Sequence, residues 1–231
     1  IKLGRRGNTP MTCAFLPPGS PVKNALYGLM KVIVPCCLTA CYRIEVIGRD
    51  NLPDVGPAII LPKHQYWTDI PLVGLAFSGT QLNYIAKQEL FRFPLISRFL
   101  MGLGGIPLDR EAPIKSKDSF RHLADLLKKG ERVVLFPEGT YYRGVMGRGK
   151  SRLIGMILKF QERNKYPTPV PFIPVGIVYG REKLRKRVTI AIGTPLYAQQ
   201  ADGVQTFTRS VMEAIARLSE LEAEQQKHLS C

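Results

Sequence analysis

Apolar and polar positions follow two different rhythms along the chain beyond residue 42. Short apolar runs, rich in valine and isoleucine, are bounded by glycine, proline and polar residues, a pattern typical of strands buried in a sheet. Strands are predicted at Arg43 to Ile47, Ala58 to Leu61, Asn83 to Ala86, Gly105 to Leu108, Arg132 to Leu135, Phe172 to Tyr179 and Arg187 to Ile192.

Amphipathic stretches separate these runs and predict helices at Ile70 to Phe77, Pro94 to Leu103, Lys115 to Lys129, Arg152 to Gln161 and Gln205 to Lys227. The clearest apolar stripe has the helical spacing i, i+3, i+4 and i+7 and consists of Phe120, Leu123, Ala124 and Leu127. Gly130 follows it as a typical C-terminal stop. Strands that alternate with helices predict a single α/β domain, from residue 43 to residue 231, with a largely parallel sheet.

The segment before residue 43 has a different character. A helix-start signal, Ser-Pro at 20–21, opens an apolar stretch that continues to Tyr42. A membrane span needs about 20 mostly apolar residues, and Lys31 and Pro35 interrupt this one. Pro35 is expected to kink or split the helix into two short pieces that dip into one leaflet or lie along its surface.

Cationic residues around this stretch favour an interfacial position, namely Lys2, Arg5, Arg6, Lys23 and Lys31. The alternative is an ordinary helix packed on the core of the domain. We therefore expect residues 1–42 to form a membrane-associating helical segment, which would place the protein at a membrane surface.

Composition adds a charge imbalance to this picture. The chain has 231 residues, 45% of them hydrophobic, and a formal net charge of +15. Such a cationic surface implies an anionic partner, which could be lipid headgroups, a phosphorylated substrate, an acidic carrier protein, coenzyme A or nucleic acid. Of the five cysteines, Cys36, Cys37 and Cys41 match no common zinc spacing, so no metal site is predicted. Unpaired cysteines are typical of a reducing, cytosolic side.

Candidate chemistry begins with His64, which follows the apolar run Ala58 to Leu61, and with Asp69 five positions later. Thr68 and Asp69 can cap the next helix, which would bring the carboxylate back toward the imidazole. A carboxylate bonded to one ring nitrogen fixes the tautomer, and the other nitrogen can then take a proton from a hydroxyl. A histidine at a strand end with a helix-capping aspartate can also be purely structural.

Three further segments follow in order: Gly104 to Arg110, Phe136-Pro137-Glu138-Gly139-Thr140, and Val170 to Val175. With the histidine block, they resemble the HxxxxD, GxxFxxR-like, FPEGTR and VPxxPV blocks of the glycerolipid acyltransferases, most closely the 1-acylglycerol-3-phosphate acyltransferases. The resemblance runs from about Glu45 to Gly193. One departure is Tyr141, which stands where the family usually has arginine after EGT.

The resemblance implies a glycerol-3-phosphate acyltransferase-like layer fold and a role for each block. His64 would be the general base, with Asp69 orienting its ring, and the acceptor phosphate would be held by Arg110 and the turn of Glu138, Gly139 and Thr140. Within that turn, Glu138 is expected to bind an acceptor hydroxyl or to position Arg110. Lys63, Arg143 and Arg148 are possible supplementary cations. Other readings of two of these residues remain open, because Arg110 could form a surface ion pair and Glu138 could cap a helix.

The implied reaction transfers a fatty acyl chain from acyl-CoA or acyl-ACP, as co-substrate, to lysophosphatidate, giving phosphatidate without a bound cofactor. Glycerol 3-phosphate or another lysolipid could also be the acceptor. The implied partners are the phospholipid bilayer and these substrates, with the protein on the cytoplasmic face of the membrane and nucleic acid not among its ligands. A non-catalytic basic membrane-binding protein and a hydrolase are alternatives from other classes.

Overall fold

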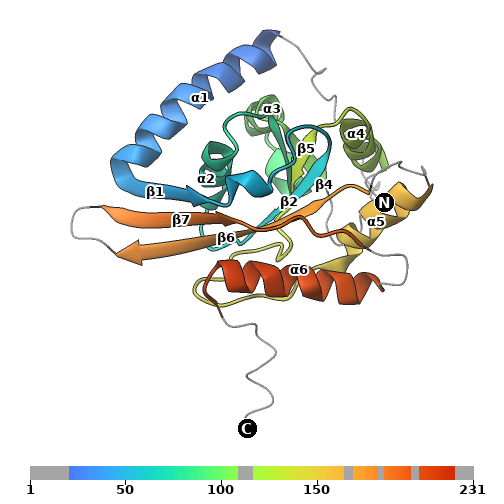
Figure 1. Ribbon diagram of the computed structural model, residues 1–231. Coiled ribbons are helices and arrows are strands. Elements are labelled where there is room, and N and C mark those ends of the chain that lie inside the picture. Colours follow the sequence, from blue (N-terminus) through green and yellow to red (C-terminus); the bar gives the residue numbers. More distant parts are fainter. Residues whose placement is uncertain (1–20, 109–116, 164–168, 182–184, 199–202, 222–231) are drawn as a thin grey trace, which may run out of the picture.

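The computed structural model describes residues 21–108, 117–163, 169–181, 185–198 and 203–221. A seven-stranded sheet with the order β1-β7-β6-β2-β5-β3-β4 forms its centre (Figure 1). Its strands are β1 (Tyr42–Ile47), β2 (Ala58–Pro62), β3 (Leu82–Lys87), β4 (Gly105–Leu108), β5 (Arg132–Val134), β6 (Phe172–Arg181) and β7 (Lys186–Ile192). Each overlaps a strand predicted from the sequence.

Strands β6, β2, β5, β3 and β4 all run in the same direction. The exception is the hairpin of β6 and β7, which pair antiparallel, and β1 then runs parallel to β7 at the sheet edge. The expected α/β fold with a largely parallel sheet is therefore confirmed. β2 lies between β6 and β5, so the segment that follows it emerges at the carboxyl edge of the parallel strands, where α/β proteins commonly place their sites.

The helices are α1 (Pro21–Cys41), α2 (Asp69–Ala76), α3 (Pro94–Gly102), α4 (Lys117–Lys128), α5 (Ser151–Arg163) and α6 (Val204–Leu218), with short 3-10 turns η1 (Arg49–Asn51) and η2 (Gln88–Phe91). Buried side chains of α4, α5 and α6 join one core cluster, and those of α1 and α2 join another. The helices therefore cover both faces of the sheet.

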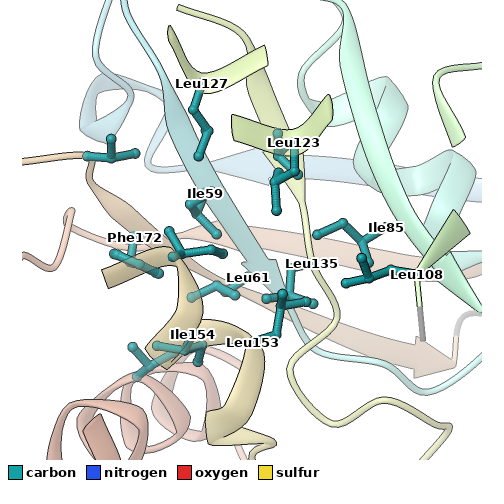
Figure 2. Packing of buried hydrophobic residues seen from close by; sticks show 14 of the residues in the cluster. Ile59, Leu61, Ile85, Leu108, Leu123, Leu127, Leu135, Leu153, Ile154 and Phe172 are labelled. Atoms are coloured by element: carbon teal, nitrogen blue, oxygen red, sulfur yellow. The ribbon is translucent and has the colours of Figure 1, made fainter. Parts of the chain in front are cut away.

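Strand β2 shows how the sequence creates these two cores. Its alternate side chains point to opposite faces, so Ile59 and Leu61 belong to the first cluster and Ala58 and Ile60 to the second. Figure 2 shows the first cluster, in which residues from strands and helices interdigitate. Fully burying an aliphatic side chain of this size stabilises the fold by about 1.5–3 kcal/mol, so these clusters hold β2 and the segment after it in a fixed position.

Two expectations about helices need correction. α1 is one continuous helix through Pro35 instead of two short pieces, and the Thr39 hydroxyl donates to the Pro35 carbonyl oxygen at 2.7 Å. The last helix ends at Leu218, well before the predicted Lys227. Glu220 adopts a left-handed backbone conformation with φ 54°, and the Leu221 N–H bonds the Ala216 carbonyl oxygen, a typical helix-terminating motif.

Candidate active site

His64 lies just beyond the carboxyl end of β2, as its place after the apolar run predicts. Its side chain is mostly buried, and its Nδ1 is 3.1 Å from Asp69 Oδ2. An ionised carboxylate only accepts hydrogen bonds, so Nδ1 carries the proton and Nε2 presents a lone pair. Within the part of the chain that the structure describes, no hydrogen bond reaches Nε2, which leaves this nitrogen available to a substrate hydroxyl.

Asp69 is the first residue of α2 and is fully buried. Its Oδ2 accepts hydrogen bonds from the backbone N–H groups of Gln65 at 2.5 Å and Tyr66 at 2.7 Å, in addition to the His64 contact. Oδ1 accepts from the Tyr179 hydroxyl at 2.5 Å. The expected capping of α2 by a side chain is not observed at Thr68. The carboxylate instead orders the turn between histidine and helix.

Two aromatic rings hold the His64 imidazole. Phe136, two positions beyond the end of β5, stacks on it with ring centroids 4.0 Å apart and an interplanar angle of 28°. Tyr141 lies on it at 4.3 Å in a tilted arrangement and is itself partly exposed. The ring is thus fixed by packing as well as by Asp69, and the tyrosine that replaces the family arginine sits directly at the histidine.

Glu138 and Lys63 form a buried ion pair beneath the histidine, with Lys63 Nζ 2.7 and 2.9 Å from the two carboxylate oxygens. Glu138 also accepts from the backbone N–H groups of His64 at 2.9 Å and Gly147 at 2.7 Å. Lys63 Nζ further donates to the Tyr142 carbonyl oxygen at 2.8 Å. Burial lowers the pKa of the Lys63 ammonium, and the Glu138 carboxylate opposes this shift. The pair ties the end of β2 to the loop after β5.

This placement changes the interpretation of both residues. The Lys63 ammonium is buried and engaged by protein acceptors, which argues against its expected role as a supplementary cation for the substrate. Glu138 is 1% exposed and both of its oxygens accept hydrogen bonds from the protein. The geometry favours a role in positioning the histidine segment over direct contact with the acceptor.

The turn after Glu138 has features suited to an anion. Gly139 adopts φ 74°, a left-handed conformation that glycine tolerates without strain, and Thr140 is exposed beside it. A Cβ added at Gly139 would lie 3.4 Å from Lys150 Nζ, so the Lys150 ammonium is next to this turn. Lys150 is therefore a cation near the turn that the sequence blocks do not include.

The other expected cations lie at different positions. Arg143 is exposed, and its guanidinium carbon lies 4.9 Å from the ring centroid of Tyr66. Arg148 is exposed on the same loop. Arg110 lies outside the described residues, two positions beyond the end of β4 at Leu108. Its expected role in phosphate binding stays a prediction.

The comparisons with known proteins show the family of this chain. The sequence model of the Acyltransferase family matches residues 43–178, more than half of the chain. This protein belongs to the acyltransferase family. The resemblance drawn from the four sequence blocks is therefore confirmed, and the matched region contains both the histidine block and the Phe136 to Thr140 block.

Similar proteins carry related names. The 1-acyl-sn-glycerol-3-phosphate acyltransferase of Bacillus subtilis (strain 168) is 32% identical over 187 residues, which cover 78% of this chain and 88% of the relative. The chloroplastic 1-acyl-sn-glycerol-3-phosphate acyltransferase LPAT1 of Arabidopsis thaliana is 29% identical over 73% of this chain, which spans about half (48%) of that longer relative. The crystal structure of the 1-acyl-sn-glycerophosphate (LPA) acyltransferase PlsC from Thermotoga maritima matches with a TM-score of 0.63 at 23% identity. This match covers 86% of this chain and 80% of the other, and it shows that the fold is shared.

Proposed function

We propose that this acyltransferase transfers a fatty acyl group from acyl-CoA or acyl-ACP to the free hydroxyl of lysophosphatidate, forming phosphatidate. The observation that carries the proposal is the His64 and Asp69 pair, oriented at the carboxyl edge of the sheet with Nε2 available for a substrate. The name of the Bacillus relative, which is matched over most of its length, supports lysophosphatidate as the acceptor.

In the proposed reaction the acceptor hydroxyl loses its proton to His64 Nε2 as its oxygen attacks the thioester carbonyl carbon. Asp69 stabilises the resulting imidazolium through Nδ1. Collapse of the tetrahedral intermediate breaks the carbon–sulfur bond, and the proton on Nε2 passes to the departing thiolate. The described cysteines, Cys36, Cys37 and Cys41, all lie in α1. In the proposed reaction the acyl group passes directly from the thioester to the acceptor hydroxyl, without an acyl-enzyme.

The acceptor phosphate is proposed to bind at the turn of Gly139 and Thr140, together with Arg110. The Gly139 N–H already donates to the Phe136 carbonyl oxygen, but the Thr140 hydroxyl can donate to phosphate oxygens, and glycine allows close approach. Lys150 beside Gly139 is the described cation best placed to replace the arginine that is absent at Tyr141. Arg143 and Arg148 on the same loop would add to the positive field.

Membrane association follows from the chemistry of the substrates and from one apolar surface. Large apolar side chains are exposed on the neighbouring elements α1, η2 and α3: Leu29, Val32, Ile33, Leu90, Phe93, Leu95, Ile96 and Phe99. Exposed Lys87, Arg92 and Arg98 accompany them. Apolar side chains with neighbouring cations suit the interface of an anionic leaflet. We propose that this α1–α3 surface rests on the cytoplasmic face of the membrane.

The helix α1 packs on the core at one point and exposes apolar side chains elsewhere, which supports the proposed contact with the membrane. Leu38 in its C-terminal half is buried in the core, whereas Leu29, Val32 and Ile33 are exposed. Among the described residues, no helix is long and apolar enough to cross a bilayer.

The deciding experiment offers a labelled acyl-CoA or acyl-ACP to the purified protein with a panel of lysolipids and glycerol 3-phosphate. Products are identified by mass, and His64→Ala is the control. Phosphatidate as the main product supports the proposal. A different acylated lysolipid would redefine the acceptor, and release of free fatty acid without an acceptor would indicate a hydrolase. Absence of thioester turnover in the wild type would indicate a non-catalytic lipid-binding protein.

A further inference from the structure

Tyr179 is outside the four sequence blocks, yet it contacts the catalytic pair directly. It lies near the end of β6, and its hydroxyl donates to Asp69 Oδ1 at 2.5 Å. The Thr68 hydroxyl is 3.2 Å from the Tyr179 oxygen, within hydrogen-bond distance. The segment after β2, the start of α2 and β6 therefore meet in one chain of hydrogen bonds that ends at His64.

Packing alone does not explain the hydroxyl of Tyr179. Its ring makes edge contacts with Tyr66 at 4.8 Å and Tyr42 at 6.4 Å between centroids, and phenylalanine would preserve both. A hydroxyl that is largely shielded from water needs a partner, and here the partner of this partly buried hydroxyl is the carboxylate that faces the proposed base. Burial, followed by the Asp69 charge, raises the pKa of Tyr179, which keeps the hydroxyl protonated as a donor.

The two oxygens of Asp69 have separate partners. Oδ2 faces His64 Nδ1 and two backbone N–H groups, while Oδ1 has Tyr179 as its donor. Fixing Oδ1 from β6 prevents rotation of the carboxylate about its own axis. The same hydrogen bond withdraws negative charge from the carboxylate, and connected hydrogen bonds polarise one another.

We propose that Tyr179 is a positioning residue of the acyl transfer, which fixes Asp69 through Oδ1 and moderates the carboxylate charge that His64 experiences. This inference rests on the proposed function, in which His64 is the general base. Tyr179 then controls both the orientation of the imidazole and the pH range in which it can accept a proton.

Other titratable and charged groups near His64 and Asp69 also influence the protonation of His64, so a test must leave them unchanged. The titratable and charged side chains around this pair are Lys63, Glu138, Tyr42, Tyr66, Tyr141 and Arg143. Tyr179→Phe removes one oxygen atom and leaves all of them in place. The substitution therefore isolates the hydroxyl.

The experiment measures kcat and KM of the full chain with lysophosphatidate across pH for the wild type and Tyr179→Phe. We expect kcat to fall by roughly one order of magnitude, because a hydrogen bond to a charged group is stronger than one between neutral groups and only part of its contribution reaches the transition state. Acceptor KM should change less than about threefold. The more negative carboxylate should favour the imidazolium, so the acidic limb of the pH profile should move up by about 0.5–1 unit.

Two further variants make the result specific. Tyr84→Phe removes a tyrosine hydroxyl that also donates to α2, at the Ile70 carbonyl oxygen 3.2 Å away, and should leave the acidic limb in place. Thr68→Val removes the contact between the Thr68 and Tyr179 hydroxyls. This substitution should move the acidic limb of the pH profile up as well, but by less than Tyr179→Phe does. If Tyr179→Phe does not fold, the shift in Thr68→Val decides the question alone.

Several outcomes would overturn the inference. If the acidic limb of the pH profile did not move in Tyr179→Phe and Thr68→Val, Tyr179 would be only a packing residue. An equal shift of this limb in Tyr84→Phe would lead to the same conclusion. A rise in KM with kcat unchanged would do the same. If the wild type showed no transfer to lysophosphatidate, the proposed function itself would fail, and if His64→Ala retained wild-type transfer, the proposed role of His64 as general base would fail. Loss of activity in His64→Ala with a normal Tyr179→Phe would refute this inference only.

Discussion

At the scale of single residues, the arrangement at His64 leads to a direct prediction. His64→Ala removes Nε2, the atom proposed to accept the hydroxyl proton, and loss of a general base typically costs about 10²–10⁴-fold in rate. Asp69→Asn should cause a large part of this loss, since an amide no longer enforces the tautomer. Initial-rate assays with purified protein measure both. His122→Ala on α4 is the matched control, and near-normal turnover of His64→Ala would contradict the mechanism.

The buried pair of Lys63 and Glu138 gives a prediction about stability. Lys63→Met leaves the Glu138 carboxylate buried without its cation, and breaking such a pair typically costs about 3–5 kcal/mol. Arg148→Met, which removes an exposed cation from the same loop, should change the free energy of unfolding by less than about 0.5 kcal/mol. Urea titration followed by circular dichroism compares them. Equal stability of the two variants would show that the pair does not hold the loop.

The sequence predicts some of these residues and misses others for a physical reason. His64 and Asp69 are five positions apart, so a short turn suffices to bring them together. Tyr179 reaches Asp69 from 110 positions away, through the pairing of β6 with β2. Tyr179 lies on the same strand face as Val175 and Ile177, and this spacing indicates from the sequence that its ring faces the core. Its hydrogen-bond partner, Asp69, is not indicated, because it depends on the register of the strands across the sheet.

At the scale of elements, strand positions and most helix ends are well predicted, and the end of α6 is the exception among the predicted helices that the structure describes. Continuous apolar runs such as Ala58 to Leu61 are buried on both faces, so tertiary packing and local pattern agree. The end of α6 depends on Glu220 in a left-handed conformation, where a sequence reading expects glycine. At Gly130, which has φ 79°, the expected residue is present and the predicted helix stop is correct.

The helix α3 leads to a prediction at this scale, because its apolar side chains face solvent. Leu95 and Phe99 are 80% and 45% exposed, so replacing both with glutamate should leave the fold intact. Binding to liposomes should weaken by roughly tenfold or more, since each buried apolar side chain contributes about 1.5–3 kcal/mol and 1.4 kcal/mol is tenfold. Co-sedimentation measures it. Val55→Glu, at another exposed apolar position, is the control.

Unchanged sedimentation of the Leu95 and Phe99 variant would remove α3 from the proposed surface. The corresponding change on α1, Val32→Glu with Ile33→Glu, would then show whether that helix acts alone. Both α1 residues lie on the exposed part of the helix, so the buried contact of Leu38 is kept. Substitution is therefore a cleaner test than deletion of α1, which would open the core.

At the scale of the whole molecule, the net charge of +15 and the α1–α3 surface should act together on membranes. Each basic residue near an anionic leaflet adds on the order of 1 kcal/mol, and this contribution is screened by salt, whereas burial of apolar side chains is not. Liposome binding should thus rise with the fraction of anionic lipid and fall, without vanishing, at high salt. Co-sedimentation at several lipid compositions and salt concentrations provides the measurement. The Leu95 and Phe99 double variant should retain the salt-sensitive part and lose most of the salt-resistant part. If the wild-type protein left anionic liposomes completely at high salt, its attachment would be purely electrostatic, and the apolar surface would need another explanation.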